Sequence, residues 1–262
     1  MTEQSNIQIH INGHPITIVP TMQLNESIVM SQAVLASPFN RIGVIVGSPG
    51  TGKTVAGYAI AHELQGIRIC AYPNMTRKDL LLHIARKFNY RGVTSTYNGL
   101  IKYLQSNANG QLIILDEGNH LNIAHMETLR YLIDEHGAAC IILGTEILDG
   151  TLQGGRHNAV LLAQFNSRVG TKRLTFSPIG HNEKPLSNDS IKRIQKYFIE
   201  PRFAIEGNKN AVVRAFYKHT HGTWRNSYEF ANTCERIMRQ QQQESINISI
   251  IEAAAHFKGR TI

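Results

Sequence analysis

A glycine-rich loop, Gly47-Ser-Pro-Gly-Thr-Gly-Lys-Thr54, restricts this chain to a small group of folds, because it fits the spacing G-x-x-x-x-G-K-[ST]. An apolar run, residues 42–46, precedes the loop, and a helical pattern follows it over residues 55–64. In such a strand–loop–helix unit the backbone N–H groups surround phosphates, and the helix N-terminus adds partial positive charge. A glycine-rich turn with a surface lysine is the alternative, but it does not account for the flanking strand and helix. We therefore expect a P-loop within an α/β fold.

The P-loop predicts ATP and Mg²⁺ as cofactors. We expect Lys53 to reach the β- and γ-phosphates and the Thr54 hydroxyl to ligate Mg²⁺. The residues expected to contact the nucleotide are Gly47, Ser48, Pro49, Gly50, Thr51, Gly52, Lys53, Thr54 and Val55.

An acidic pair follows a second apolar run, residues 112–115, about sixty residues after the P-loop. Asp116 is expected to hold the Mg²⁺ shell, and Glu117 to orient or deprotonate the attacking water. An acidic pair after an apolar run is by itself an ordinary strand end. Together with a complete P-loop it predicts ATP hydrolysis.

Short apolar runs alternate with amphipathic stretches in the middle of the chain, which is typical of a parallel sheet covered by helices. The predicted strands are residues 42–46, 67–71, 112–115, 140–143 and 169–176. The predicted helices between them are residues 53–64, 76–88, 95–105 and 123–135, with an interrupted stretch over 146–165.

Both ends of the chain have a different pattern from its middle. Residues 7–19 suggest a hairpin turning at Asn12 and Gly13, and residues 26–35 a helix. From Ser187 onward the pattern is helical, over residues 190–198, 210–220, 225–240 and 248–257, with Asp189 and Asn208 as expected N-caps. We predict an N-terminal extension at 1–40, a nucleotide-binding α/β core at 41–180 and a small helical lid at 181–262.

Three more polar residues are candidates for the nucleotide site. Thr145 follows the run 140–143 and could sense the γ-phosphate, although a plain strand-to-helix turn is the alternative. Arg168 precedes the last predicted strand and could reach a neighbouring subunit's ATP in trans, or could be a surface residue. Arg225 opens a helix of the predicted lid and could touch the same phosphates.

Charge and composition narrow the choice of partners and location. The formal net charge of +8 and pI near 9.5 favour a polyanionic partner, such as nucleic acid or anionic lipid. There is no signal-peptide pattern and no apolar run of roughly 20 residues, so we expect a soluble, cytoplasmic protein without a membrane partner. The three cysteines form no Cys-x-x-Cys pair, which argues against a zinc site or a disulfide framework.

Three segments carry a family resemblance: Gly52-Lys-Thr-Val-Ala56, Leu115-Asp-Glu-Gly-Asn-His-Leu121 and Ile142-Leu-Gly-Thr-Glu-Ile-Leu148. With the lid and the arginine before the last strand, they make the chain resemble the AAA+ ATPases over residues 40–240. Within that superfamily it is most similar to the transposition regulators that include the phage Mu B protein and TnsC. It departs from the Mu protein in having no helix-turn-helix pattern at its start.

The resemblance implies a DNA-stimulated ATPase that assembles on double-stranded DNA as a ring or helical filament when ATP is bound. It further implies selection of a transposition target and recruitment or stimulation of a transposase. The resemblance implies that Arg77, Lys78, Arg91, Lys102 and Asn119 face the DNA. Contacts of this kind are made to the DNA backbone, and the affinity would fall as the salt concentration rises. A secretion-related ATPase, a helicase loader and a small-molecule kinase are the alternatives, and the kinase is disfavoured because an Asp-Glu pair suits water activation.

Overall fold

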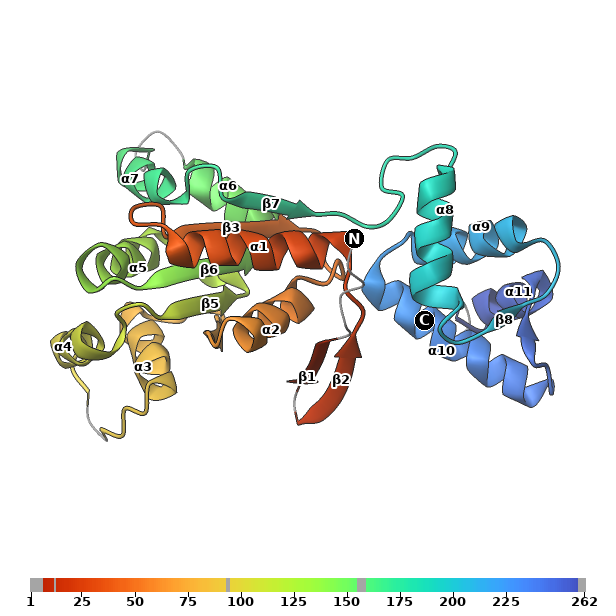
Figure 1. Cartoon of the computed structure of the whole chain (residues 1–262), viewed down its shortest axis with the longest axis horizontal. Helices are drawn as coiled ribbons and strands as arrows, with labels where there is room; N and C mark the ends of the chain where they lie inside the picture. Colours follow the sequence, from red (N-terminus) through yellow and green to blue (C-terminus); the bar gives the residue numbers. More distant parts are fainter. Residues whose placement is uncertain (1–6, 12, 93–94, 155–158, 259–262) are drawn as a thin grey trace. The chain divides into compact units, whose positions relative to one another are not determined.

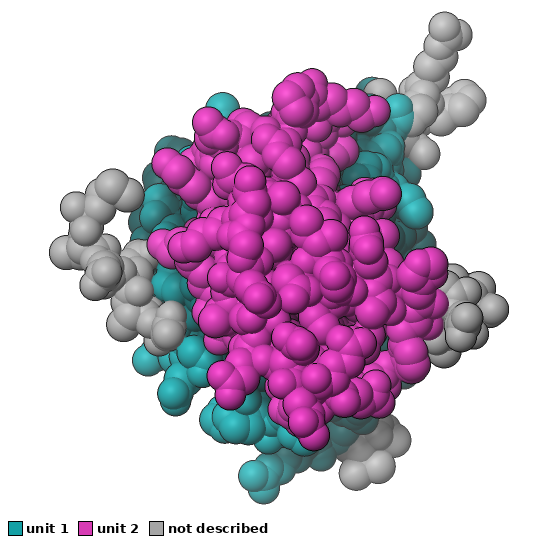
Figure 2. All heavy atoms as spheres, turned by 90° about the vertical axis from the view of Figure 1, so that its right-hand side faces the viewer, with its two compact units in different colours: residues 1–49, 53–176 teal, residues 50–52, 177–262 magenta. Residues whose placement is uncertain are grey.

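A five-stranded parallel sheet forms the centre of the first of two structural units (Figure 1). The computed structural model describes residues 7–11, 13–92, 95–154 and 159–258. The first unit comprises residues 1–49 and 53–176, and the second comprises residues 50–52 and 177–262, shown in magenta in Figure 2.

The strands of the sheet lie in the order β4-β5-β6-β3-β7. Their bounds are β3 Ile42–Gly47, β4 Ile67–Cys70, β5 Leu112–Asp116, β6 Ala139–Gly144 and β7 Arg173–Phe176. Every residue of β5 and β6 is buried, as expected for central strands that helices cover on both faces. The predicted α/β fold with a parallel sheet is therefore confirmed.

Helices cover the two faces of the sheet in unequal numbers. On one face lie α1 Met22–Ala36 and α2 Lys53–Glu63, packed with Ile45, Ile114 and Leu143. The other face, with Val44, Leu115 and Ile142, is covered by the remaining helices, α3 Arg77–Lys87, α4 Tyr97–Asn107, α5 Ile123–His136, α6 Glu146–Gln153 and α7 Ala159–Val169. Alternate residues of each central strand thus point to different core clusters, which is the period of two that a strand imposes.

A glycine sets the distance between α2 and the sheet. A Cβ placed on Gly57 would lie 2.6 Å from Leu143 Cδ1 and 3.5 Å from Ile114 Cγ2. A larger residue would therefore require the Leu143 side chain to repack or α2 to move away from β6. The close packing holds the helix that begins at Lys53 against the strands that end at Asp116 and Gly144.

The N-terminal segment, as far as it is described, shares the core of the first unit. Two antiparallel strands, β1 Ile7–Ile11 and β2 His14–Ile18, form the predicted hairpin, and Ile9 and Ile18 are buried with α1 and α2. The predicted turn residue Asn12 lies outside the described residues. The helix predicted at 26–35 corresponds to α1, which is longer: it begins at Met22, with Thr21 as its N-cap, and ends at Ala36.

One predicted strand begins at the wrong residue. The run 169–176 was expected to be a strand throughout, but Val169 is the last residue of α7 and β7 begins at Arg173. Val169 is buried in the same cluster as Leu162 and Phe165, which precede it at the spacing of one helical face. Its apolar side chain therefore belongs to the helical pattern.

The second unit is mainly helical and has a core of its own, which includes Phe198, Phe216 and Phe230. Its elements are α8 Asn188–Ile194, a π-helical turn η2 Gln195–Ile199, α9 Lys209–Thr220, α10 Trp224–Gln240 and α11 Ile248–Lys258. Two short parallel strands, β8 Ala204–Ile205 and β9 Ser245–Ile246, were not predicted. Asn208 caps α9 as expected, whereas α8 is capped by Ser187, and Asp189 lies in its first turn.

No helix in the described part of the chain is long and apolar enough to span a membrane.

Candidate functional site

The candidate site lies at the carboxyl edge of the parallel sheet. There β3 leads into the P-loop, β5 ends at Asp116 and leads into Glu117, and β6 leads into Thr145. Because β6 lies between β3 and β5, the P-loop strand and the acidic strand are separated by two strand spacings, roughly 10 Å. Ligands of open α/β sheets bind at this edge.

The lysine of the P-loop is bonded to the loop itself. Lys53 is the first residue of α2, and its Nζ donates to the carbonyl oxygens of Gly47 at 2.6 Å and Ser48 at 2.9 Å. Gly50 and Gly52 have φ angles of 80° and 96°, which side chains other than glycine rarely adopt. The Thr54 side chain is exposed in the first turn of α2. A cationic head and a hydroxyl therefore stand at the start of one helix.

Arg225 belongs to the second unit, as do residues 50–52. In this unit the Gly50 carbonyl accepts hydrogen bonds from the backbone N–H groups of Trp224 at 2.9 Å and Arg225 at 3.4 Å. Thr223 caps α10 immediately before them. The Arg225 residue itself is exposed.

Asp116 is a buried carboxylate with both oxygens engaged. It is 3% exposed, and its Oδ1 accepts the backbone N–H of Glu117 at 2.9 Å. Its Oδ2 accepts a hydrogen bond from Nη2 of Arg68, a residue of β4, and the two form an ion pair. Sequence reasoning missed Arg68, although a charged residue within the apolar run 67–71 was a signal that it has a partner.

Glu117 is exposed, and its side chain accepts a hydrogen bond from Asn119, a residue that the sequence analysis predicted to face DNA. Its backbone lies in the left-handed region, with φ 55° and ψ 41°. Nδ2 of Asn119 donates to Glu117 Oε2 at 3.2 Å. Oδ1 of Asn119 accepts hydrogen bonds from the backbone N–H of Thr145 at 2.6 Å and from its hydroxyl at 2.9 Å. The amide of Asn119, expected to face DNA, is therefore engaged within the chain between Glu117 and Thr145.

Thr145 is the N-cap of α6, where its hydroxyl oxygen accepts the N–H of Ile147 at 3.3 Å. Thr145 thus lies in a strand-to-helix turn, which was the alternative to a γ-phosphate sensor. The hydroxyl also faces Asn119, so this turn is joined to the acidic strand end.

Cys70 ends β4 beside this acidic strand end, because it is paired in register with Asp116. Burial raises the pKa of the Cys70 thiol, and the negative charges of Asp116 and Glu117 raise it further, while Arg68 lowers it. The thiol is therefore protonated at neutral pH.

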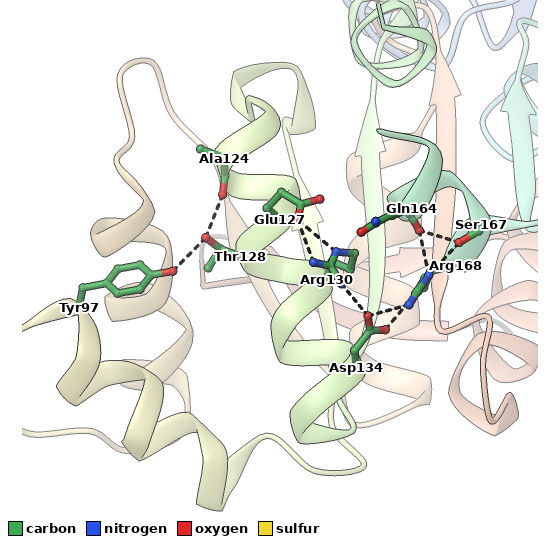
Figure 3. A network of polar contacts seen from close by, with 9 residues as sticks. All are labelled: Tyr97, Ala124, Glu127, Thr128, Arg130, Asp134, Gln164, Ser167 and Arg168. Carbon is green, nitrogen blue, oxygen red and sulfur yellow. Dashed lines mark hydrogen bonds and ion pairs between the residues drawn. The ribbon is translucent and has the colours of Figure 1, made fainter. Parts of the chain in front are cut away.

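Arg168 belongs to a polar network that joins α7 to α5 (Figure 3). It is near the end of α7, and its Nε and Nη2 donate to Asp134 on α5 at 3.0 and 2.9 Å. Asp134 also binds Arg130, which in turn binds Glu127. Since α5 and α7 end just before β6 and β7 begin, this network lies toward the amino edge of the sheet. Arg168 cannot reach the carboxyl edge of its own sheet from there.

The remaining basic candidates lie on or between two helices of one sheet face. Arg77 and Lys78 are exposed in the first turn of α3, and the Arg77 guanidinium lies 5.5 Å from the ring centre of Tyr97. Arg91 is exposed between α3 and α4, and Lys102 is exposed on α4. None of the four has an ion pair within the described part of the chain.

Comparisons with known proteins agree on the fold. Residues 40–152 match the family described as AAA domain. A Staphylococcus aureus protein described as a potential ATP-binding protein is 25% identical over 177 residues, which are 66% of this chain and 57% of that protein. This chain therefore matches little more than half the length of that relative.

Solved structures of Thermotoga maritima RuvB are similar in fold. The RuvB Holliday junction branch migration motor has a TM-score of 0.57 at 18% identity, covering 91% of this chain and 69% of that one. A point mutant of the same RuvB has a TM-score of 0.58 at 18% identity, covering 89% and 68%. The chain has the fold of a P-loop AAA+ protein. The narrower resemblance to transposition regulators stays a prediction.

Proposed function

We propose that this chain is an ATPase that binds ATP and Mg²⁺ at the carboxyl edge of its parallel sheet. The observation that carries the proposal is the convergence of two segments on that edge. One is the P-loop with Lys53 and Thr54, and the other is the hydrogen-bonded group of Glu117, Asn119 and Thr145 after Asp116. A phosphate cradle beside a carboxylate that can activate water is the arrangement that hydrolysis of a nucleoside triphosphate needs.

Each residue then has a defined role. Residues 47–52, apart from Pro49, and Val55 present backbone N–H groups to the phosphates; Pro49 has no N–H and contacts the nucleotide only through its ring and carbonyl. Lys53 exchanges the carbonyls of Gly47 and Ser48 for phosphate oxygens. Glu117 holds or deprotonates the attacking water. In this proposal the Thr145 hydroxyl senses loss of the γ-phosphate, and Arg225 contacts the phosphates.

The donors at the site fit Mg²⁺. Thr54 offers a hydroxyl oxygen and Asp116 a carboxylate, and Mg²⁺ is commonly held by one or two protein oxygens together with substrate phosphates and water. Among the described residues, no three His, Cys, Asp or Glu side chains group to hold a metal ion by themselves. Thr54 and Asp116 would hold the ion, whose positive charge would stabilise the negative charge of the phosphates.

A narrower proposal is that ATP binding drives assembly on double-stranded DNA. It is supported by the net charge of +8, by exposed cations at Arg77, Lys78, Arg91 and Lys102, and by a fold shared with a DNA branch migration motor. In such a ring or filament, Arg168 acts on the nucleotide of a neighbouring subunit. The resemblance to transposition regulators makes target selection and recruitment or stimulation of a transposase the assembly's task.

Electron microscopy combined with a nucleotide-binding measurement tests the ATPase proposal and the DNA-assembly proposal separately. The protein is incubated with duplex DNA at low salt and with ATP, ADP or a slowly hydrolysed ATP analogue, and nucleotide binding is measured in parallel. Rings or filaments only with ATP or its analogue support the DNA proposal. Nucleotide binding without assembly on DNA rejects it in favour of a secretion-related or helicase-loader ATPase, and absence of nucleotide binding rejects the ATPase itself.

A further inference from the structure

Arg68 occupies the carboxylate that the proposed function assigns to Mg²⁺. It lies on β4, in register with Ile114 of β5, and its Nη2 forms the ion pair with Oδ2 of Asp116. The other oxygen, Oδ1, accepts the N–H of Glu117 at 2.9 Å. A divalent cation that approaches Asp116 therefore meets a guanidinium already bound there.

Helix α2 encloses Arg68 from the other side. The Arg68 guanidinium lies 4.0 Å from the ring centre of Tyr58, a cation–π distance. Its Nε is buried and finds no hydrogen-bond acceptor among the described residues. The side chains of Arg68 and Asp116 are only 17% and 4% exposed. A buried donor without an acceptor is unfavourable, so Nε does not stabilise this position of the side chain. The contacts that hold the Arg68 guanidinium are those with Asp116 and Tyr58.

We propose that Arg68 is a built-in counter-ion of Asp116 that competes with Mg²⁺ for this carboxylate. The inference rests on the proposed function, in which Asp116 serves the metal. A buried carboxylate without a cation is costly, so Arg68 stabilises the nucleotide-free protein. The same positive charge opposes a divalent cation at short range and low exposure, where Coulomb interactions are weakly screened.

The competition makes Mg²⁺ binding depend on the nucleotide. Mg²⁺ alone has to displace Arg68 with little compensation, whereas Mg²⁺ arriving with a triphosphate is also held by phosphate oxygens. Arg68 thereby sets how much Mg²⁺ the site requires. The opposite model is a positioning residue that orients Asp116 toward the metal, and it predicts the reverse effect of removing Arg68.

The test is a Mg²⁺ titration of the binding of a fluorescent, slowly hydrolysed ATP analogue to the wild-type chain and to Arg68→Gln and Arg68→Lys. We expect the Mg²⁺ midpoint to fall about 5- to 150-fold in Arg68→Gln, the range of typical coupling between sites, and less in Arg68→Lys, which keeps the charge. Arg130→Gln removes an ion-paired arginine of α5 with the same change in net charge, and should shift the midpoint less than about twofold. An unchanged or higher midpoint in Arg68→Gln overturns the proposal.

Different experimental results would reject the competition between Arg68 and Mg²⁺ and the proposed function on which it rests. No analogue binding by the wild-type chain at any Mg²⁺ concentration rejects the nucleotide site itself. Normal binding with no shift in Arg68→Gln rejects only the competition. If Arg68→Gln does not fold, the wild-type chain is followed by ¹⁵N NMR of its arginine Nε–H groups, with Arg68→Lys used for assignment. The Arg68 resonance should shift when Mg²⁺ joins the analogue complex, and a resonance that does not move overturns the proposal.

Discussion

Asn119 accepts two hydrogen bonds from Thr145, one from its backbone N–H and one from its hydroxyl, across 26 positions of sequence. The same amide donates to Glu117. The ends of β5 and β6 are thereby joined by one side chain, and the carboxylate proposed to activate water is linked to the hydroxyl proposed to sense the γ-phosphate. In this structure Asn119 thus connects the Glu117 carboxylate to Thr145.

Replacement of Asn119 by alanine should slow hydrolysis while sparing nucleotide binding. The change releases Glu117 and leaves the N–H of Thr145 without its acceptor, which should cost about 1–3 kcal/mol of stability. We expect kcat to fall about tenfold, with ATP affinity changed less than about twofold. Steady-state kinetics and thermal unfolding measure both, and Asn107→Ala, which alters an exposed amide bonded within α4, is the control. Wild-type turnover in Asn119→Ala would remove the residue from the mechanism.

Replacement of Glu117 by glutamine should separate binding from hydrolysis. The amide keeps the size of the side chain but cannot accept a proton, so turnover should fall about 10²-fold or more while ATP still binds. A DNA-bound assembly that disperses on hydrolysis should then persist. Turnover and the lifetime of the assembly on DNA are measured together, with the exposed Glu146→Gln as control. Unchanged turnover would reject Glu117 as the water-activating group.

Arg168 should act only across subunits. Arg168→Ala should lower hydrolysis by the DNA-bound assembly about 10³-fold, whereas Asp134→Asn, which removes the partner and leaves the guanidinium, should change it little. Each variant should lose only about 1 kcal/mol or less of stability, because the pair is partly exposed. Mixing Arg168→Ala with Lys53→Ala subunits should restore part of the activity, since each lacks what its neighbour supplies. No recovery in the mixture, with both variants assembling, would confine Arg168 to joining α7 and α5.

His125 should make the protein less stable in mild acid. It is 2% exposed on α5, and burial lowers its pKa below the ordinary value of 6.5. The unfolded chain therefore binds a proton at a higher pH than the folded chain does, so stability is retained above about pH 6.5 and lost as the pH falls below it. Thermal unfolding between about pH 7.5 and about pH 5 should show a shallower decline in His125→Gln than in the wild type. The exposed His181→Gln should leave the slope unchanged, and an equal slope in all three chains would show that another group controls it.

The fold and the nucleotide loop were predictable because their signals are local. A P-loop needs a strand before it and a helix after it, and all three lie within residues 42–63. The position of Asp116 and Glu117 at the end of a buried strand was predictable by the same reasoning, whereas their roles in hydrolysis stay predictions. Val169 shows the limit of local reading, because its apolar side chain suits a helix face as well as a strand.

Arg68 and Asn119 could not be placed from the sequence because their roles depend on partners far along the chain. Arg68 meets Asp116 across 48 positions, and Asn119 meets Thr145 across 26. Both contacts follow from strand order and register, which bring β4 and β6 to either side of β5. Periodicity identifies each strand but does not say which strands are neighbours.

Gly57 gives the site a fixed geometry. Because Gly57 has no side chain, the backbone of α2 lies directly against Leu143 and Ile114 at this position, 2.6 and 3.5 Å from where a Cβ would stand. The helix that begins at Lys53 and the strand that ends at Asp116 are therefore in close packing contact, so a shift of one relative to the other would change the distance between the two side chains. If an alanine at position 57 moved α2 away from the sheet, the distance between the Lys53 ammonium group and the Asp116 carboxylate would increase. Nucleotide binding would then weaken although neither of these two residues had been changed.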